Sequence, residues 1–285
     1  MAAWGRLTLR AWDVVTVRRA GAMSAEAAAP YWLGDGPRGV LLLHGFAGTP
    51  PELRILAEWL ANHGFLVHAP LLAGHGTTPE EMARTGRWDW IRSADQALDQ
   101  LLARCSHVGV AGQSMGATLA LHLAANRPEV EAVVSQAGLL HLSDWRLRIL
   151  PAVKGLVRWE VPSGAVDLYR AEGLQELFSY PRRPTSAILE LVRLGKLVRT
   201  EMGAVVQPLL VLHGGRDSVV DPANAAQILA LASSSVRALR RFERSGHGMS
   251  VDVDRAAVAE VAGRWLEDFV GTASDGRLNL CPEAL

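Results

Sequence analysis

Short apolar runs and amphipathic segments alternate along most of this chain. The runs at 39–43, 65–69, 107–111 and 130–135 are largely apolar, which is typical of strands covered on both faces of a parallel sheet. Between the first two runs, residues 52–62 place Leu53, Leu56, Ala57 and Leu60 on one helical face. Strands and helices in turn predict an α/β fold with a mostly parallel, doubly wound sheet.

The same alternation extends towards the C-terminus. It predicts strands at 207–212 and 236–242, and helices at 88–104, 115–126, from Asp221-Pro222 onwards, and at 255–270. It stops over about 139–204, where leucine, tryptophan and arginine occur in segments broken by prolines. Because a bare loop of this length is uncommon in a compact domain, we expect a small helical cap insertion over the carboxyl edge of the sheet.

The predicted organisation has three parts. An N-terminal extension, expected to be disordered, covers 1–30, a domain with the insertion at about 139–204 covers 31–271, and a C-terminal tail covers 272–285. Residues 1–22 carry four arginines against Asp13 and fit an edge strand, a basic surface anchor or a dispensable extension. We favour the last, with Met23 as the true start.

Composition excludes several classes of protein. The 29 basic and 29 acidic residues balance, so nothing points to nucleic acid or an anionic membrane as a partner. No apolar run approaches the ~18 residues of a membrane span. Cys105 and Cys281 are the only cysteines, too few for a disulfide framework and without metal-ligand spacing. We expect a cytoplasmic protein without cofactor or metal, and leave its oligomeric state open.

Candidate chemistry follows the carboxyl ends of four predicted strands. GQSMG at 112–116 has the form of a nucleophile elbow around Ser114, although a tight turn is the simpler reading. HGGRDSVVDP places Asp217 after one strand, ERSGHGM places His247 after another, and HGFAG forms a glycine-rich turn after the first. Because these ends meet at one sheet edge, we expect a serine, an acid and a base together there.

Other residues compete for these positions. Asp221 also follows the 209–212 run, but it precedes Pro222 and suits a helix N-cap, so Asp217 is the preferred acid. His44, His75 and His213 are expected to make structural hydrogen bonds.

Five stretches resemble the α/β-hydrolase superfamily and, more narrowly, bacterial carboxylesterases and monoacylglycerol lipases: LLLHGFAGTP, HAPLLAGHGTTPEEM, VGVAGQSMGATLAL, LLVLHGGRDSVVDP and FERSGHGMSVD. The resemblance implies an α/β-hydrolase fold with Ser114 as nucleophile, Asp217 as acid and His247 as base. It also implies an oxyanion hole made by the N–H groups of Phe46 and Met115. Gln113 departs from the apolar residue that relatives often carry before the serine.

The resemblance further implies a serine hydrolase that cleaves carboxylic esters with short to medium acyl chains, or monoacylglycerols. The insertion is rich in leucine and tryptophan, so we expect Trp145, Leu147 and Trp159 to line an apolar substrate pocket. A carbon–carbon bond hydrolase or cofactor-free peroxidase with the same triad, and a non-catalytic binding protein, are the alternatives.

Overall fold

The computed structural model describes residues 28–272 apart from 144–146, 148, 151–156, 162–166 and 178–179. Most of the expected N-terminal extension (1–27), Trp145 and the tail after Thr272 therefore lie outside the described residues. Within them, no helix is both long enough and apolar enough to cross a membrane.

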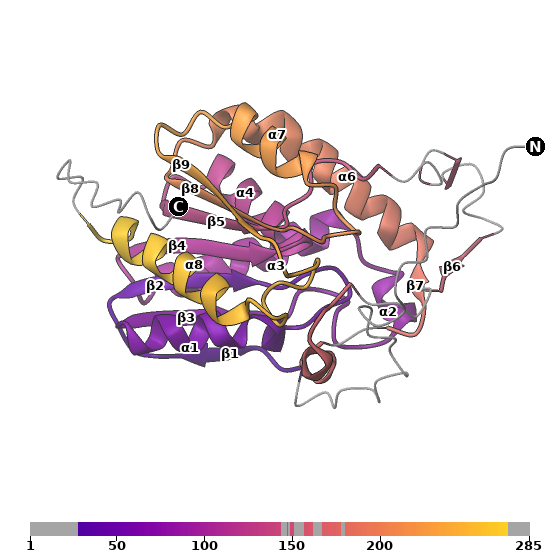
Figure 1. The fold of residues 1–285 in the computed structure, drawn as a ribbon, viewed down its shortest axis with the longest axis horizontal. Helices are drawn as coiled ribbons and strands as arrows, with labels where there is room; N and C mark the ends of the chain where they lie inside the picture. Colours follow the sequence, from indigo (N-terminus) through magenta and orange to yellow (C-terminus); the bar gives the residue numbers. More distant parts are fainter. Residues whose placement is uncertain are drawn as a thin grey trace, which may run out of the picture.

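A seven-stranded sheet forms the centre of the molecule (Figure 1), in the order β1-β3-β2-β4-β5-β8-β9. The strands are β1 (Tyr31–Leu33), β2 (Arg38–Leu43), β3 (Phe65–Ala69), β4 (His107–Gln113), β5 (Val130–Gln136), β8 (Leu209–Gly214) and β9 (Arg237–Phe242). All of the pairings are parallel except that of β1, which runs antiparallel to β3. The predicted mostly parallel, doubly wound sheet is confirmed.

Helices cover both faces of this sheet. On one face lie α1 (Arg54–Asn62), preceded by the 3₁₀ turn η1 (Pro50–Leu53), and α8 (Arg255–Phe269). On the other lie α3 (Arg87–Leu102), α4 (Met115–Asn126), α6 (Thr185–Glu201) and α7 (Ala223–Leu231). Alternate residues of each buried strand face the two layers: Val40 and Leu42 of β2 face α1 and α8, and Leu41 and Leu43 face the other side.

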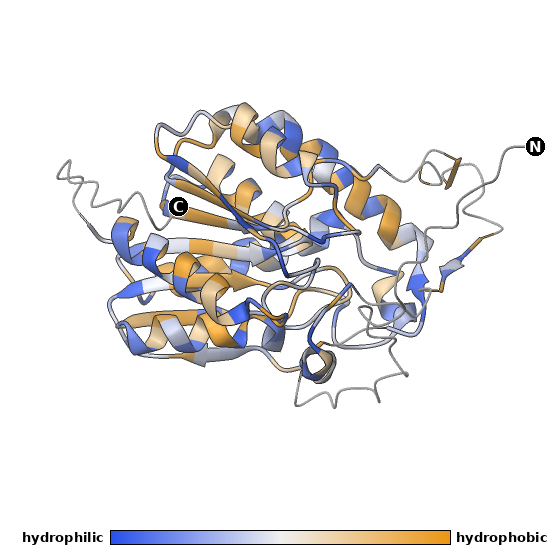
Figure 2. Ribbon diagram, in the orientation of Figure 1, coloured by the Kyte–Doolittle hydropathy of each residue, from blue (hydrophilic) through white to orange (hydrophobic). Residues whose placement is uncertain are grey.

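Hydropathy follows these layers in Figure 2, where the central strands are mostly apolar and helices such as α8 carry both polar and apolar residues. The edge strand β9 contains three arginines, of which Arg237 and Arg241 are exposed. Charged residues on an edge strand oppose pairing with a further chain.

Several predicted boundaries move by a residue or two, and two of these shifts have a clear local reason. The strand expected from residue 207 begins at Leu209, because Pro208 has no N–H group for the ladder. The helix expected from Asp221 begins at Ala223, whose N–H donates to Asp221 Oδ1 at 2.8 Å.

The interval 139–204 contains both short elements and a long helix. The short elements are β6 (Trp159–Glu160), which pairs antiparallel with β7 (Arg183–Pro184), and the 3₁₀ turns η2 (Ala171–Gln175) and η3 (Met202–Ala204). The long helix α6 lies against α3 and α4. The C-terminal end of the interval, from Thr185 onwards, is therefore part of the helical layer that covers the sheet. Outside it, the short helix α2 (Pro79–Met82) contacts β7.

Candidate active site

The turn from β4 into α4 holds Ser114 in an unusual backbone conformation, with φ 55° and ψ −114°. Residues other than glycine rarely adopt such a positive φ, because this backbone conformation costs them ~1–3 kcal/mol. A Cβ on Gly112 would lie 2.3 Å from the carbonyl oxygen of Gly116, and a Cβ on Gly116 would lie 1.9 Å from that of Leu43. Both glycines are therefore required by close backbone approach, and the bend presents the serine at the carboxyl end of β4.

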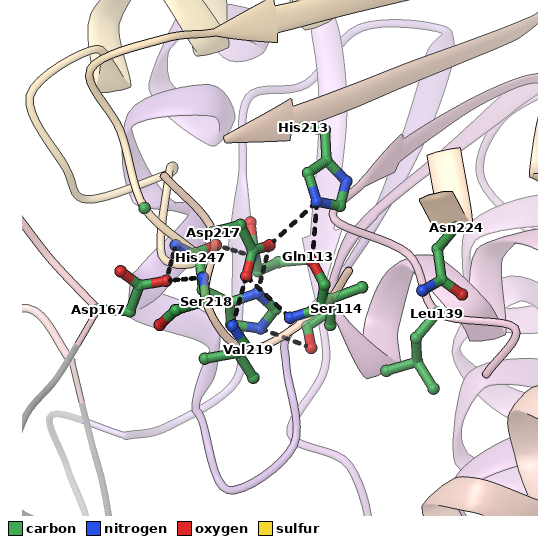
Figure 3. A network of polar contacts seen from close by, with 12 residues as sticks. Gln113, Ser114, Leu139, Asp167, His213, Asp217, Ser218, Val219, Asn224 and His247 are labelled. Carbon is green, nitrogen blue, oxygen red and sulfur yellow. Dashed lines mark hydrogen bonds and ion pairs between the residues drawn. The ribbon is translucent and has the colours of Figure 1, made fainter. Parts of the chain in front are cut away.

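Ser114, His247 and Asp217 form a hydrogen-bonded series (Figure 3). His247 Nε2 lies 2.9 Å from Ser114 Oγ, and His247 Nδ1 lies 2.9 Å from Asp217 Oδ2. An Nδ1–H donating to the carboxylate leaves Nε2 to accept the serine hydroxyl proton. The structure thus brings together the three side chains that the loops after β4, β8 and β9 contribute.

The carboxylate of Asp217 is fixed from two further sides. Its Oδ1 accepts the N–H groups of Val219 at 2.9 Å and Val220 at 2.8 Å. His213 Nε2 lies 3.3 Å from Oδ2 and 3.1 Å from the Val220 carbonyl oxygen. Burial on its own raises the pKa of Asp217, but the charge and hydrogen bond of His247 outweigh it and lower that pKa. Asp217 is therefore ionised where it contacts the imidazole.

Burial also opposes the charged form of His247, yet neighbouring carboxylates reverse the effect. The charge and hydrogen bond of Asp217, followed by the charges of Asp167 and Glu52, raise the pKa of His247 above its usual value. An imidazolium formed during a reaction is thereby stabilised.

The competing acid, Asp221, is occupied elsewhere. Its Oδ1 accepts the Ala223 N–H, and its carbonyl oxygen accepts from the backbone N–H of Asn224 at 2.9 Å. The N-cap of α7 is Pro222 rather than the expected Asp221, but the Asp221 carboxylate still accepts the first N–H of the helix. The structure thus separates the two aspartates, and Asp217 is the one at His247.

The glycine-rich loop after β2 runs beside the serine. A Cβ on Gly45 would lie 3.5 Å from Ser114 Cβ, and Phe46 is the next residue along this loop. Met115 is the first residue of α4, and N–H groups in the first turn have no acceptor within the helix. From the sequence, the N–H groups of these two residues are expected to form an oxyanion hole.

A buried carboxyl group lies beneath this loop. Glu52 Oε1 accepts the N–H of Gly45, and a Cβ on Gly48 would lie 2.3 Å from Glu52 Oε2. Burial raises the pKa of Glu52 to about 7, although the Gly45 hydrogen bond opposes the shift. Sequence reasoning missed this residue, because PPEL reads only as a helix start.

His44 and His75 also lie near the loop, and both have local backbone partners. His44 Nε2 accepts the Leu72 N–H at 3.0 Å, and its Nδ1 lies 2.9 Å from the Gly45 carbonyl oxygen. His75 Nδ1 lies 3.0 Å from the Ala73 carbonyl oxygen. Burial lowers the pKa of both rings, that of His75 to about 4, so they are neutral structural groups, as expected.

The residue before the serine, Gln113, belongs to a buried polar network. Its Nε2 donates to the His247 carbonyl oxygen at 2.6 Å. Ser250 Oγ donates to Gln136 Oε1 at 2.7 Å and contacts Gln113 Oε1 at 3.2 Å. The network joins the β4 and β5 ends to the loop that carries His247.

The expected pocket residues are less fully placed. Trp145 lies outside the described residues, and Leu147 is half-buried in the insertion. Trp159 is half-buried in β6, with the Arg182 guanidinium 4.3 Å from its ring centroid. Among the described contacts none links either of these two to Ser114, so their role stays a prediction. No group of three or more His, Cys, Asp or Glu residues in the described part of the chain is arranged to hold a metal ion.

Comparison with known sequences gives a consistent result. The model of the family described as serine aminopeptidase, S33 (Hydrolase_4) matches residues 37–254. The thermostable monoacylglycerol lipase of Bacillus sp. strain H-257 is 35% identical over 247 residues, covering 86% of this chain and 95% of that protein. The carboxylesterase of Bacillus subtilis strain 168 is 25% identical over 239 residues, covering 84% and 96% respectively.

Solved structures agree with this assignment. One from work on LipS and LipT, two metagenome-derived lipolytic enzymes, matches with a TM-score of 0.81 at 29% identity and covers 86% of this chain and 100% of its own. A soluble variant of monoglyceride lipase from Saccharomyces cerevisiae matches with a TM-score of 0.71 at 17% identity, covers 84% of this chain and 91% of its own, and supports the fold alone. The chain therefore belongs to the Hydrolase_4 family of the α/β-hydrolase superfamily, and it is a serine hydrolase of the lipase and esterase type.

Proposed function

We propose that the protein cleaves carboxylic esters with Ser114 as nucleophile, His247 as general base and acid, and Asp217 as the group that orients His247. One observation carries this assignment. An unbroken series of two 2.9 Å contacts runs from Asp217 Oδ2 through the imidazole to Ser114 Oγ. A serine hydroxyl needs such a base to become an effective nucleophile.

Acylation follows from these positions. His247 Nε2 takes the hydroxyl proton as Ser114 Oγ attacks the ester carbonyl carbon. The N–H groups of Phe46 and Met115 donate to the resulting oxyanion, each such donor contributing ~2.7–4 kcal/mol in comparable enzymes. The intermediate then collapses, the ester C–O bond breaks, and His247 returns its proton to the departing alcohol.

Deacylation repeats the cycle with water. His247 removes a proton from a water molecule, whose oxygen attacks the acyl carbon attached to Ser114. The second tetrahedral intermediate expels Ser114 Oγ, which recovers the proton from His247, and the carboxylic acid leaves. Asp217 remains ionised throughout and stabilises the imidazolium.

We assign the substrates to monoacylglycerols and esters with short to medium acyl chains. The relative at 35% identity bears the name monoacylglycerol lipase, which supports this choice. An apolar wall formed by Trp145, Leu147 and Trp159 would hold the acyl chain. The same proposal places the protein in the reducing cytoplasm, since its two cysteines predict no disulfide framework.

Substrate profiling tests the proposal. Wild-type protein is assayed with nitrophenyl esters of increasing chain length, with mono-, di- and triacylglycerols, and with an amino-acid nitroanilide, because the family description names an aminopeptidase. We expect short and medium esters and monoacylglycerols to be cleaved, and Ser114→Ala to cleave none of them. Preferential cleavage of the anilide, or full activity of Ser114→Ala, would contradict the proposal.

The pocket assignment has its own test. A polar residue at Leu147 or Trp159 should lower activity on medium-chain esters more than on acetate esters, because an acetyl group needs little apolar wall. An equal loss on both would remove the assignment.

A further inference from the structure

Asp167, in the insertion, contacts the backbone of two loops of the candidate active site (Figure 3). Its Oδ2 accepts the Ser218 N–H at 2.6 Å and the His247 N–H at 3.1 Å. Ser218 follows Asp217 directly. A single carboxylate oxygen therefore joins the loop that presents the acid to the loop that presents the base.

The loop of His247 is shaped to accept this contact. A Cβ on Gly246 would lie 2.5 Å from the Asp167 carbonyl oxygen and 2.7 Å from Asp167 Oδ1. Only a residue without a side chain allows the two backbones to approach so closely. The glycine before His247 thus accommodates the insertion itself.

A second carboxylate, Asp252, joins the loop of His247 to the insertion, and this one comes from the His247 side. Asp252 is fully buried, accepts the Gly246 N–H on Oδ2 at 2.8 Å, and accepts the Tyr169 N–H on Oδ1 at 2.8 Å. Arg170 adds a hydrogen bond from its guanidinium to the Val251 carbonyl oxygen at 3.3 Å. The segment 167–170 is therefore fixed to the loop of His247 by side chains from both partners.

We propose that Asp167 is a positioning residue, which sets the distance between Asp217 and His247 by holding both of their loops and so makes the insertion part of the catalytic apparatus. This positioning role rests on the proposed roles of Ser114, His247 and Asp217. Asp167 acts through the backbone and does not touch the reacting atoms. Misplacement of catalytic groups by ~1 Å costs up to about a hundredfold in rate, so such a hold has a measurable effect.

Its charge provides a second, independent signature. The carboxylates that face His247 are Asp217, Asp167 and Glu52, and His213 lies behind Asp217. Each of these carboxylates raises the pKa of His247. Loss of the Asp167 charge should therefore lower the pH at which His247 becomes protonated.

Two substitutions separate geometry from charge. Asp167→Asn keeps an oxygen that accepts both N–H groups but removes the charge, whereas Asp167→Ala removes both. The matched controls are Glu80→Gln and Glu80→Ala, because Glu80 also ties the insertion to the body of the protein, through Arg182, without contacting either loop. All variants are assayed on nitrophenyl acetate, so that contacts between the insertion and a long acyl chain play no part. The melting temperature of each variant is measured as well.

We expect Asp167→Ala to lower kcat by about tenfold to a hundredfold with a smaller change in KM, and Asp167→Asn to lose less. Both should shift the acid limb of the kcat/KM profile to lower pH, and both Glu80 variants should match wild type. A purely structural role would change the melting temperature without moving the acid limb, and it would overturn the inference. A kcat of Asp167→Ala equal to that of the wild type would overturn it as well. Ser114→Ala is included as a reference: if it stays active, the proposed triad itself fails.

Discussion

Gln113 Nε2 donates a hydrogen bond to the carbonyl oxygen of His247 at 2.6 Å. Gln113 immediately precedes Ser114, so the residue beside the proposed nucleophile also holds the loop of the proposed base. A leucine at this position would have no donor for that carbonyl group. A side-chain hydrogen bond therefore links the end of the strand before Ser114 to the loop of His247.

Gln113→Leu should accordingly lower kcat on nitrophenyl acetate by about tenfold, through a looser His247 loop, with KM nearly unchanged. Gln207→Leu is the matched control, because Gln207 Nε2 donates to the Ala124 carbonyl oxygen at 2.9 Å, away from the active site. Steady-state kinetics of both variants check the effect. If Gln113→Leu behaves like Gln207→Leu, the hydrogen bond has no role in positioning His247.

Asp217 and Asp221 should respond very differently to the same change. Asp217→Asn removes the charge that stabilises the imidazolium and should lower kcat by about 10⁴-fold. Asp221→Asn retains an oxygen for the Ala223 N–H and should keep most of the activity. The measurement is the kcat of ester hydrolysis by the two purified variants. The reverse ranking would show that the acid is Asp221.

Activity should fall on the acid side with a midpoint above the ordinary histidine value of about 6.5. Only neutral His247 accepts the serine proton, and its pKa is raised by Asp217, Asp167 and Glu52 against the effect of burial. As the pH drops through that pKa, the fraction of competent enzyme falls. The pH profile of kcat/KM measures the midpoint. A midpoint below 6.5 would show that burial outweighs the carboxylates.

Glu52 should make the fold less stable as the pH rises. The pKa of its carboxyl group is raised from 4.5 to about 7 by burial, so the folded state binds the proton more tightly than the unfolded state. The stability contribution of the protonated carboxyl group is therefore present below a pH of about 4.5 and is lost as the pH rises to about 7, by up to ~3 kcal/mol.

Glu52→Gln cannot ionise and can still accept the Gly45 N–H, so it should not show this loss. Urea unfolding at several pH values measures the free energy of unfolding of both proteins. The advantage of Glu52→Gln over wild type should grow between pH 5 and pH 8. A constant difference across that range would show that the carboxyl group titrates alike in both states.

The sequence predicted the sheet and the three positions of the proposed triad because they depend on local patterns. Apolar runs mark the buried strands, and the helix at 115–126 and the strand at 65–69 agree with the structure at both ends. The three-residue strand β1 is too short to show a period. Helix α6 does not come directly after a strand of the main sheet, so its sequence reads as part of the insertion. In the structure it packs on α3 and α4.

The contacts that hold the site were beyond sequence reasoning. Gln113, Asp167 and Glu52 all bind backbone N–H or C=O groups, which every residue carries and no motif records. Their partners lie between 7 and 134 positions away along the chain, and only folding brings them together. A serine, an aspartate and a histidine can be recognised by type and by position after a strand, but these supporting groups cannot.

Covalent labelling of Ser114 tests the central claim most directly. An organophosphate nitrophenyl ester phosphorylates an activated serine hydroxyl and releases nitrophenol, which leaves a stable adduct. Intact-mass and peptide mass spectrometry of the wild-type chain should find one adduct, on Ser114, formed in proportion to the loss of ester hydrolysis. Ser114→Ala should remain unlabelled, and His247→Ala should label far more slowly. Loss of activity with the adduct on another residue, or full labelling of His247→Ala, would contradict the account.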